Sequence, residues 1–325
     1  MRLPKFEYFA PKSLKEAVSI LQNAPSAKIL AGGTDLLVNM KHKVECPPAI
    51  VNIKGINNLD YIKQDNGAVR IGALTTLKRI YMTSLISEKL PALAEAASVV
   101  GSYHHQTMGT LAGNICQQNR CKFFNQSFWW RSSRPTCFKA GGQICHVVNK
   151  KEICYSSYCG DVAPVLLVLN AKIVVTGPKD SREIPLEDFF SGDGKAPLSL
   201  SEGEILTEII IARQAMDGVS GYIKFANREN IDFPIVGTAL WASMENKEYR
   251  VAFTAVDRKP LRAHRVEAFM NGKNLSEEIL DEASALAAKE AKPVKTSFYS
   301  TPYKRRLMGL LLKSTVSETM RRAKS

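Results

Sequence analysis

Two groups of residues in this sequence have types and spacings suited to chemistry, and they are neighbours in the chain. A glycine-rich segment, Thr-Met-Gly-Thr-Leu-Ala-Gly-Asn, runs from 107 to 114. Six of the seven cysteines follow it within 44 residues: Cys116, Cys121, Cys137, Cys145, Cys154 and Cys159. Glycine-rich loops let backbone N–H groups approach a phosphate, and thiolates are soft metal ligands. A phosphate site next to a soft-metal site predicts redox chemistry.

The spacing of the four inner cysteines does not decide which metal they bind. Fifteen residues separate Cys121 from Cys137, seven separate Cys137 from Cys145, and eight separate Cys145 from Cys154. Four thiolates suit zinc or an iron–sulfur cluster, and both usually include a closer pair than these four contain. Aromatic residues between them, with few acidic ones, suit a partly desolvated cluster. We interpret His146 as a bystander, and free thiols on an irregular loop remain an alternative.

A glycine-bearing loop also lies about 75 residues upstream of the glycine-rich segment, and is the first of the two in chain order. It reads Ala-Gly-Gly-Thr-Asp over 31–35, between a predicted strand at 27–30 and an apolar segment at 36–38. A strand, a glycine pair and a helix start form a common anion cradle. The Gly-Lys-Ser/Thr of a Walker loop and the Gly-x-Gly-x-x-Gly turn are both missing. Alone, this loop also suits a plain tight turn, but two such loops could converge on one diphosphate.

The elements that must position these loops change character along the chain. The first hundred residues alternate helix (13–23, 76–82, 92–100) with strand (27–30, 49–53, 68–73), and 162–169 predicts a helix capped by Asp161. Strands follow at 173–176, 183–184 and 204–211, and polar, small residues at 212–221 predict a domain boundary. Strands at 222–225, 235–241 and 250–256 then precede helices at 263–270, 276–291 and 302–314. This order predicts an α+β domain.

Composition limits the classes of protein that the chain can be. Its 325 residues, 45% hydrophobic and 23% charged, allow two or three domains with buried cores. There is no 18-residue apolar run and no apolar leader, so we expect a cytoplasmic protein without membrane contact, in which clustered cysteines favour metal over disulfides. The net charge of +13 is spread along the chain. We therefore expect no nucleic-acid partner.

Several segments together resemble a known family. Segments 29–36 and 109–115 resemble the flavin-pyrophosphate loops of the FAD-binding subunits of molybdenum hydroxylases, the family of xanthine and carbon monoxide dehydrogenases. Segment 160–164 is similar to the acidic helix-start motif of that family. Segment 222–225, with Arg228, Asp232 and Pro234, resembles its strand after the linker, and 301–307 its C-terminal helix. Ala112 departs from the pattern, because the family usually has glycine there.

The resemblance implies a fold and a division into domains. It implies an α+β, two-subdomain FAD-binding fold of the molybdenum-hydroxylase (PCMH-like) type over 1–214, with subdomains at about 1–55 and 56–214. A C-terminal α+β domain, a sheet with helices, is implied over 219–325.

The resemblance also implies which residues contact FAD. Backbone N–H groups of 31–35 and 110–114 would hold the diphosphate, Asp161 a hydroxyl, and Lys224 would lie near the flavin. On the residues alone, Asp161 also suits a helix cap, Lys224 a surface lysine, and Val100 and Leu206 core packing. The full set of expected cofactor contacts is Ile29, Leu30, Ala31, Gly32, Gly33, Thr34, Asp35, Leu36, Val100, Thr110, Leu111, Ala112, Gly113, Asn114, Asp161, Leu206 and Lys224.

Most family members run directly from the second loop to the acidic motif, whereas about forty residues intervene here. This insertion, at about 116–159, is similar to the one in the beta subunits of 4-hydroxybenzoyl-CoA reductases, which carries a 4Fe–4S cluster. The likeness implies four cluster ligands and leaves Cys116 and Cys159 as spare thiols. The implied ligands are Cys121, Cys137, Cys145 and Cys154. It further implies that the cluster lies beside FAD, as an entry step for electrons.

No nucleophile, paired carboxylate or proton relay stands out, which is typical of a subunit whose chemistry belongs to its cofactors. The resemblance implies a large molybdenum-cofactor subunit and a small subunit with 2Fe–2S clusters as partners, in a heterotrimer or its dimer. Electrons from a ferredoxin-like donor would drive reductive dehydroxylation of an aromatic substrate such as 4-hydroxybenzoyl-CoA. One alternative is a xanthine or CO dehydrogenase-like hydroxylase subunit that passes electrons outward. Another is a zinc-stabilised basic binding module.

Overall fold

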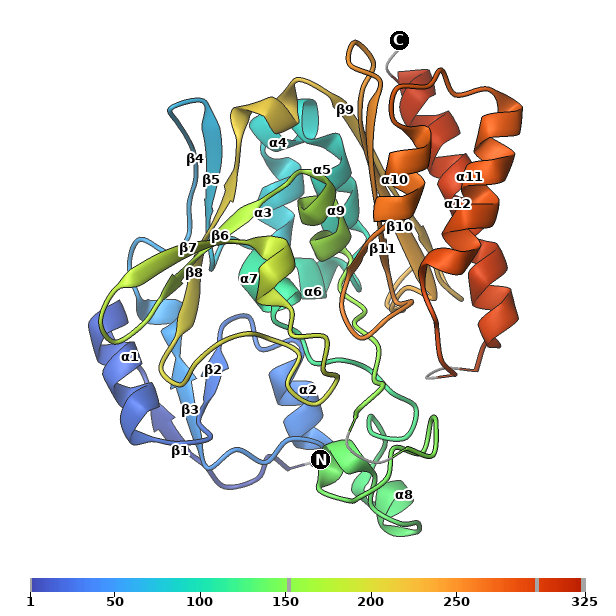
Figure 1. Ribbon diagram of the computed structural model, residues 1–325. Helices are drawn as coiled ribbons and strands as arrows, with labels where there is room; N and C mark the ends of the chain where they lie inside the picture. The colour runs from blue at the N-terminus through green and yellow to red at the C-terminus, as the bar shows by residue number, and fades with distance from the viewer. Residues whose placement is uncertain (1, 151–152, 296–297, 323–325) are drawn as a thin grey trace.

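Three separate sheets organise the chain in the computed structural model, which describes residues 2–150, 153–295 and 298–322 (Figure 1). The first sheet has the order β1-β3-β2, and both of its pairings are parallel. Parallel neighbours need a crossover connection, and two helices provide it. The elements are β1 (Glu7–Phe9), α1 (Leu14–Asn23), β2 (Lys28–Leu30), α2 (Leu36–Lys41) and β3 (Ala49–Asn52). The loop 31–35 therefore leaves the carboxyl end of β2, where open α/β sheets bind ligands.

The second sheet has five antiparallel strands in the order β4-β5-β8-β6-β7. They are β4 (Ile62–Asp65), β5 (Ala68–Gly72), β6 (Lys172–Thr176), β7 (Ser181–Pro185) and β8 (Ile205–Ile211). Every residue of β8 is buried, as its central position requires. Short 3₁₀ turns accompany the sheets: η1 (Ile53–Gly55), η3 (Leu186–Phe189) and η4 (Arg213–Met216).

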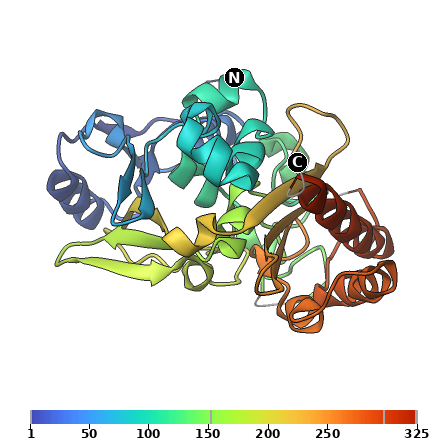
Figure 2. The ribbon, with the colours of Figure 1, turned by 90° about the horizontal axis from the view of Figure 1, so that it is seen from above.

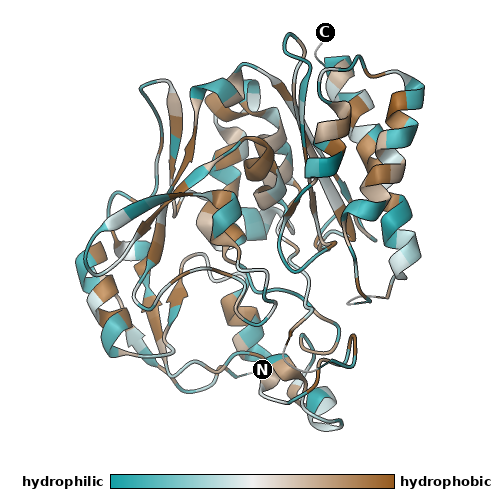
Figure 3. Ribbon diagram, in the orientation of Figure 1, coloured by the Kyte–Doolittle hydropathy of each residue, from teal (hydrophilic) through white to brown (hydrophobic). Residues whose placement is uncertain are grey.

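A layer of helices lies between β5 and β6 in the chain and carries the second glycine loop. It comprises α3 (Leu77–Met82), α4 (Ser84–Lys89), α5 (Pro91–Ser98), α6 (Tyr103–Met108), α7 (Leu111–Ile115) and α9 (Val162–Val168). All seven residues of α9 are buried, and it is the dark brown helix near the centre of Figure 3. A helix that is apolar on every side must be enclosed by protein, so α9 is the fixed centre against which the loops are packed.

The insertion between α7 and α9 has little regular structure. Its only described helices are α8 (Phe128–Ser132) and the 3₁₀ turn η2 (Phe138–Ala140). Isolated bridges pair Arg120 with Ser157, Cys137 with Ile144, and Cys145 with Lys150. In Figure 1 the segment lies beside α2, at the lower edge of the molecule.

The C-terminal domain is an antiparallel sheet, β12-β11-β10-β9, covered on both faces. Its strands are β9 (Val219–Phe225), β10 (Val236–Ser243), β11 (Glu248–Thr254) and β12 (Leu261–Arg262). Strand residues alternate between faces: Ala239 and Trp241 join the core with α5 and α9, whereas Leu240 and Ala242 join a second core. Three helices close that second core on the outer face: α10 (His264–Met270), α11 (Glu277–Glu290) and α12 (Thr301–Arg322) (Figure 2).

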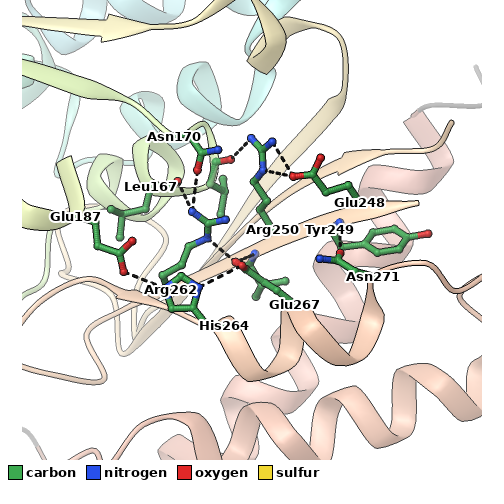
Figure 4. A network of polar contacts seen from close by, with 12 residues as sticks. Leu167, Asn170, Glu187, Glu248, Tyr249, Arg250, Arg262, His264, Glu267 and Asn271 are labelled. Carbon is green, nitrogen blue, oxygen red and sulfur yellow. Dashed lines mark hydrogen bonds and ion pairs between the residues drawn. The ribbon is translucent and has the colours of Figure 1, made fainter. Parts of the chain in front are cut away.

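Two arginines of the C-terminal sheet fix the far end of α9 (Figure 4). Arg262 Nη1 donates to the Leu167 carbonyl at 3.1 Å and to Asn170 Oδ1 at 2.9 Å, and Arg250 Nη1 donates to the Val168 carbonyl at 3.4 Å. Cations at a helix C-terminus satisfy its free carbonyls and oppose the negative end of its dipole. The C-terminal domain thus holds the helix whose other end reaches the site described below.

The predicted long elements are confirmed, and two kinds of difference remain. The terminal helix continues to Arg322, beyond the predicted end at 314. The short elements β1, β4, β12, α4, α6, α7 and α8 were not predicted, because two to six residues carry too little periodicity. Among the described residues, none of the helices has the length and apolar character needed to cross a membrane.

Candidate functional site

The two glycine loops meet, as the sequence predicted. Gly32 lies against the backbone of residues 108 and 109, so closely that a Cβ on Gly32 would overlap the carbonyl oxygen of Met108. Gly33 has φ +77°, in the left-handed region that glycine adopts without strain. Glycine at both positions is therefore required by close approach and by backbone conformation.

The first loop presents unpaired backbone donors. Within the described chain, the N–H groups of Gly32, Gly33 and Thr34 have no hydrogen-bond acceptor. An N–H group removed from water needs a partner, so three successive free donors in a concave loop form an anion-binding nest. The Asp35 carboxylate is occupied, since it pairs with Arg120 and accepts the Gln118 N–H at 3.2 Å.

The second loop offers fewer free donors than predicted. The N–H groups of Leu111 and Ala112 donate to the Thr75 and Ala73 carbonyls at 2.9 and 3.3 Å. Those of Gly113 and Asn114 donate to the hydroxyl and carbonyl of Thr110, at 3.1 and 2.9 Å. Thr110 caps α7 with its side chain, so the local cap takes up two of these four donors, and the carbonyls of Ala73 and Thr75 take up the other two. The second loop contributes mainly its shape.

Asp161 is buried, with 3% of its surface exposed, and the prediction that it caps α9 through its side chain is wrong. Its carboxylate accepts the Tyr222 hydroxyl at 2.8 Å and the Lys224 ammonium at 3.3 Å. Asn114 Oδ1 instead accepts the Val162 N–H of α9, at 3.4 Å. Burial raises the pKa of Asp161 to about 6, against the opposing effects of Lys224 and Tyr222.

A cavity of about 740 Å³ runs between the two loops, Asp161 at the start of α9, and the segment 198–206. This volume lies in the range of cofactor sites, about 300–1,000 Å³. Fourteen of the predicted cofactor contacts line it: Ile29, Ala31, Gly32, Gly33, Thr34, Asp35, Leu36, Val100, Thr110, Ala112, Gly113, Asn114, Asp161 and Leu206.

The three remaining predicted contacts lie outside the cavity lining. Leu30 and Leu111 are buried in hydrophobic cores, because they occupy inward-facing positions of β2 and α7. Lys224 contacts the site through Asp161 and donates a second hydrogen bond to the Val99 carbonyl at 2.9 Å. The Lys224 side chain is only 7% exposed, so it is not a surface lysine.

The four inner cysteines line one small pocket within the insertion. Cys121, Cys137, Cys145 and Cys154 all contribute to it, together with Phe123, Phe124, Phe138, Lys139, His146, Val147 and Ser156. Among the described residues, no three His, Cys, Asp or Glu side chains are grouped so that they could hold a metal ion. Four cysteines spread over 34 positions of a nearly helix-free segment nevertheless line the same pocket.

Backbone features of the insertion turn these thiols toward the pocket. A Cβ on Gly142 would overlap the Thr136 carbonyl, and Gly141 has φ +98°, so the turn after Cys137 depends on both glycines. Backbone hydrogen bonds from Phe123 and Phe124 reach Cys121 and favour its thiolate, although burial raises its pKa to about 11. Amide donors to sulfur are typical of metal–thiolate sites.

Lys139 places a partly buried ammonium at the same pocket. Its Nζ donates to the Asn119 carbonyl at 3.0 Å and to Ser156 Oγ at 3.4 Å. Burial lowers the pKa of Lys139 to about 8, opposed by the nearby thiols Cys154 and Cys121 and by Glu45. A cation at this position suits a pocket that would hold several thiolates. His146 also lines the pocket, but its Nε2 is hydrogen bonded to the Pro135 carbonyl at 2.8 Å.

The cavity and the pocket are lined by residues that are direct neighbours in the chain. Arg120 lines the cavity and Cys121 lines the pocket. Cys116 and Cys159 line the cavity and not the pocket, and burial raises the pKa values of their thiols to about 12 and about 11. The chain thus divides its six clustered cysteines between two adjoining sites.

Comparison with known proteins identifies the family. The model of the FAD binding domain in molybdopterin dehydrogenase matches residues 4–213. The model of the CO dehydrogenase flavoprotein C-terminal domain matches residues 221–319. The chain belongs to the FAD-binding medium subunits of the molybdenum hydroxylase family. It is therefore a flavoprotein subunit of an oxidoreductase, and the alternative of a zinc-stabilised binding module loses its support.

Relatives of the subunit act on different substrates. The chain is 29% identical over 291 residues to the nicotinate dehydrogenase FAD-subunit of Eubacterium barkeri, covering 85% of this chain and 83% of the relative. It is 26% identical over 318 residues to the xanthine dehydrogenase FAD-binding subunit of Escherichia coli O157:H7, covering 96% and 95%. The structure of carbon monoxide dehydrogenase from Hydrogenophaga pseudoflava superposes with a TM-score of 0.83, at 26% identity and 99% coverage of both chains.

Some residues at the site were not expected from the sequence. Arg120, Lys139 and Tyr222 are brought there by tertiary packing, and as single polar residues in mixed segments they carry no local signal. Lys304 of α12 is also buried, with Nζ donating to the Ala255 carbonyl at 3.0 Å. Only its position within the C-terminal helix motif marks it in the sequence.

Proposed function

We propose that FAD occupies the 740 Å³ cavity with its diphosphate at the free N–H groups of residues 32–34. Two negative charges at this position would be met by backbone donors that have no other partner. FAD supplies electron storage and transfer when bound. Asp161, held by Tyr222 and Lys224, would accept a hydrogen bond from a cofactor hydroxyl.

We further propose that the pocket in the insertion holds a 4Fe–4S cluster ligated by Cys121, Cys137, Cys145 and Cys154. Soft thiol donors, amide donors to sulfur and aromatic walls suit such a cluster. Lys139 would offset part of the negative charge of the thiolates. Because binding needs thiolates and burial favours the neutral thiol, loading would release protons.

The single observation that carries the functional proposal is the adjacency of Arg120 and Cys121, which face the two sites. A cluster one residue from the flavin cavity would relay electrons. The chain is then the electron-transfer subunit of a molybdenum enzyme, with a large molybdenum-cofactor subunit and a small 2Fe–2S subunit as partners. Like its relatives named as dehydrogenases, it would pass electrons outward from the substrate side.

In a second candidate function, electrons flow in the opposite direction, from a donor toward the substrate. The four-cysteine pocket resembles the feature that distinguishes 4-hydroxybenzoyl-CoA reductases, in which a ferredoxin-like donor would deliver electrons for aromatic dehydroxylation. The relatives favour the hydroxylase direction, and only the insertion favours the reductase. Domains at 1–214 and 219–325, with the insertion at about 116–159, are part of both proposals.

Chemical analysis of anaerobically purified protein tests the cofactor content. We expect a yellow-brown protein with one flavin and about four irons per chain. Zinc in place of iron, in a protein without flavin, would contradict both assignments. A reduced ferredoxin that reduces the flavin within the assembled enzyme, with no turnover in the oxidative direction, would favour the reductase.

A further inference from the structure

The insertion carries a large share of the positive charge of the protein. Between residues 116 and 159 the sequence has seven Lys or Arg and a single Asp or Glu, and the whole chain has a net charge of +13. This segment of 44 residues therefore contributes +6. Arg120 and Lys139 belong to the cavity and the pocket, so the other five cations and the one acidic residue leave +4 for the rest of the segment. A net positive charge of this size produces a local positive potential that steers acidic macromolecules toward it.

At the tip of the insertion, α8 exposes two large aromatic side chains. Trp129 is 81% exposed and Phe128 is 50% exposed, with their rings in edge contact at 6.1 Å. Cations flank them: Lys43 Nζ lies 5.9 Å from the Phe128 ring, and Arg134 lies 3.5 Å from the ring of neighbouring Trp130. Aromatic residues at the centre with arginine around them are typical of the energetic centre of protein interfaces.

This surface is connected to one wall of the cysteine pocket through Trp130 and Phe123. Trp130 contacts Phe123, with ring centroids 6.5 Å apart, and Phe123 lines the pocket. On the other side Phe123 contacts His146, at 5.7 Å, which also lines the pocket. Arg131 anchors α8 to the rest of the protein through a hydrogen bond from Nη2 to the Lys43 carbonyl, at 2.5 Å. A partner seated on α8 would therefore lie next to the thiols.

We propose that the α8 surface, formed by Phe128, Trp129, Arg134 and Lys43, is the docking site for an acidic one-electron carrier protein. The inference rests on the proposed cluster and holds for either direction of electron flow. One electron passes between the carrier and the cluster, so one is oxidised as the other is reduced, and no bond or proton has to move. The cationic rim would orient the carrier, and the aromatic centre would exclude water from the contact.

The test compares two electron donors on the assembled, cofactor-loaded enzyme. A small acidic bacterial ferredoxin, previously reduced, is the docking probe, and reduced methyl viologen is a donor that needs no docking. The variants are Trp129→Ala and Arg134→Glu. The matched controls are Phe298→Ala, which removes another exposed aromatic, and Lys15→Glu, which makes the same charge change on α1. Reduction of the flavin is followed by stopped-flow absorbance at low and high salt.

We expect each α8 variant to slow reduction by ferredoxin about tenfold at low salt, with the controls and the viologen rates unchanged. Salt should slow the unmodified enzyme and affect Arg134→Glu much less. Unchanged ferredoxin rates, or equal slowing with both donors, would overturn the docking site. The docking site would also be overturned if Trp129→Ala lost binding to a single-stranded oligonucleotide but kept its binding to ferredoxin. Iron analysis of each sample shows separately whether the cluster is present.

Discussion

The flavin cavity and the cysteine pocket adjoin one another but are built in different ways. The cavity is formed by backbone groups at the ends of regular elements, with Gly32 packed on Met108 and Asn114 on the start of α9. The pocket is formed by side chains from a segment whose only described helices are α8 and η2. One site is held by the hydrophobic cores around it, and the other has few such contacts.

This difference shows how a redox site can be added to an existing fold. The glycine loops of the cavity are fixed by β2, α7 and α9, and the insertion adds only residues near its two ends to the walls, among them Cys116, Arg120 and Cys159. Arg120 pairs with Ser157 within the insertion and brings its two ends together. The insertion is joined to the rest of the fold by contacts such as the Tyr158 N–H donating to the Asp257 carbonyl at 3.0 Å and Arg131 Nη2 donating to the Lys43 carbonyl at 2.5 Å. Metal binding is expected to supply the folding energy of the pocket, as in small metal-dependent domains.

The largest expected effect separates the two sites completely. Cys137→Ala should lose essentially all iron and keep the flavin, because three thiolates leave one iron without its ligand. Iron and flavin are measured per chain, and Cys46→Ala, an exposed cysteine outside the pocket, is the control. Full retention of iron by Cys137→Ala would remove that residue from the ligand set.

The reverse separation comes from Gly32→Ala. The added methyl group overlaps the Met108 carbonyl, which is backbone and cannot easily move. Overpacking of this kind costs about 3 kcal/mol, or a roughly hundredfold loss of FAD affinity. Flavin content and affinity should fall while iron stays, whereas Gly55→Ala, where a Cβ has room, should resemble the unmodified protein. Loss of iron together with flavin would mean that the sites are not independent.

A smaller effect concerns the buried carboxylate of the cavity. The folded pKa of Asp161 is raised to about 6 from its usual 3.8. Between these pH values the folded state holds more protons than the unfolded state, so stability falls as pH rises. Relative to Asp161→Asn, the free energy of unfolding should decrease by about 2–3 kcal/mol between pH 4 and pH 7. Denaturant titrations across this range measure it, and an increase would show that Lys224 dominates instead.

The smallest expected effect lies at the junction between the two sites. The Tyr158 hydroxyl donates to the Asn114 and Ile115 carbonyls at 3.2 and 3.0 Å, and so ties the end of the insertion to the second loop. Tyr158→Phe should destabilise the protein by about 1 kcal/mol and leave iron and flavin in place. Thermal unfolding with cofactor analysis measures both, and loss of either cofactor would make Tyr158 essential to its site.

The regular part of the molecule could be predicted from the sequence because its signals are local. The strand, glycine pair and helix at 27–38 were predicted correctly, and so was the fully apolar α9. The meeting of the two loops was also predicted, since both have the composition of anion cradles. The number of free N–H donors in each loop was not predicted, because in the second loop it depends partly on whether Thr110 caps α7.

Tertiary contacts account for what the sequence did not predict. Asp161 has the position of a helix cap, but Tyr222 and Lys224, more than sixty residues later, bind its carboxylate. Lys139 and Arg120 are two of many cations in a basic chain until folding places them at the pocket and the cavity. The spacing of the cysteines likewise did not show that Cys116 and Cys159 face the cavity.

The central claim is that one chain carries a flavin and, beside it, a four-iron cluster. Low-temperature electron paramagnetic resonance of the chemically reduced protein tests it most directly, with the signal integrated against flavin content. We predict an iron–sulfur signal of about one spin per flavin that disappears in Cys137→Ala while the flavin remains. A reduced protein that contains its full flavin and shows no iron–sulfur signal would contradict the account.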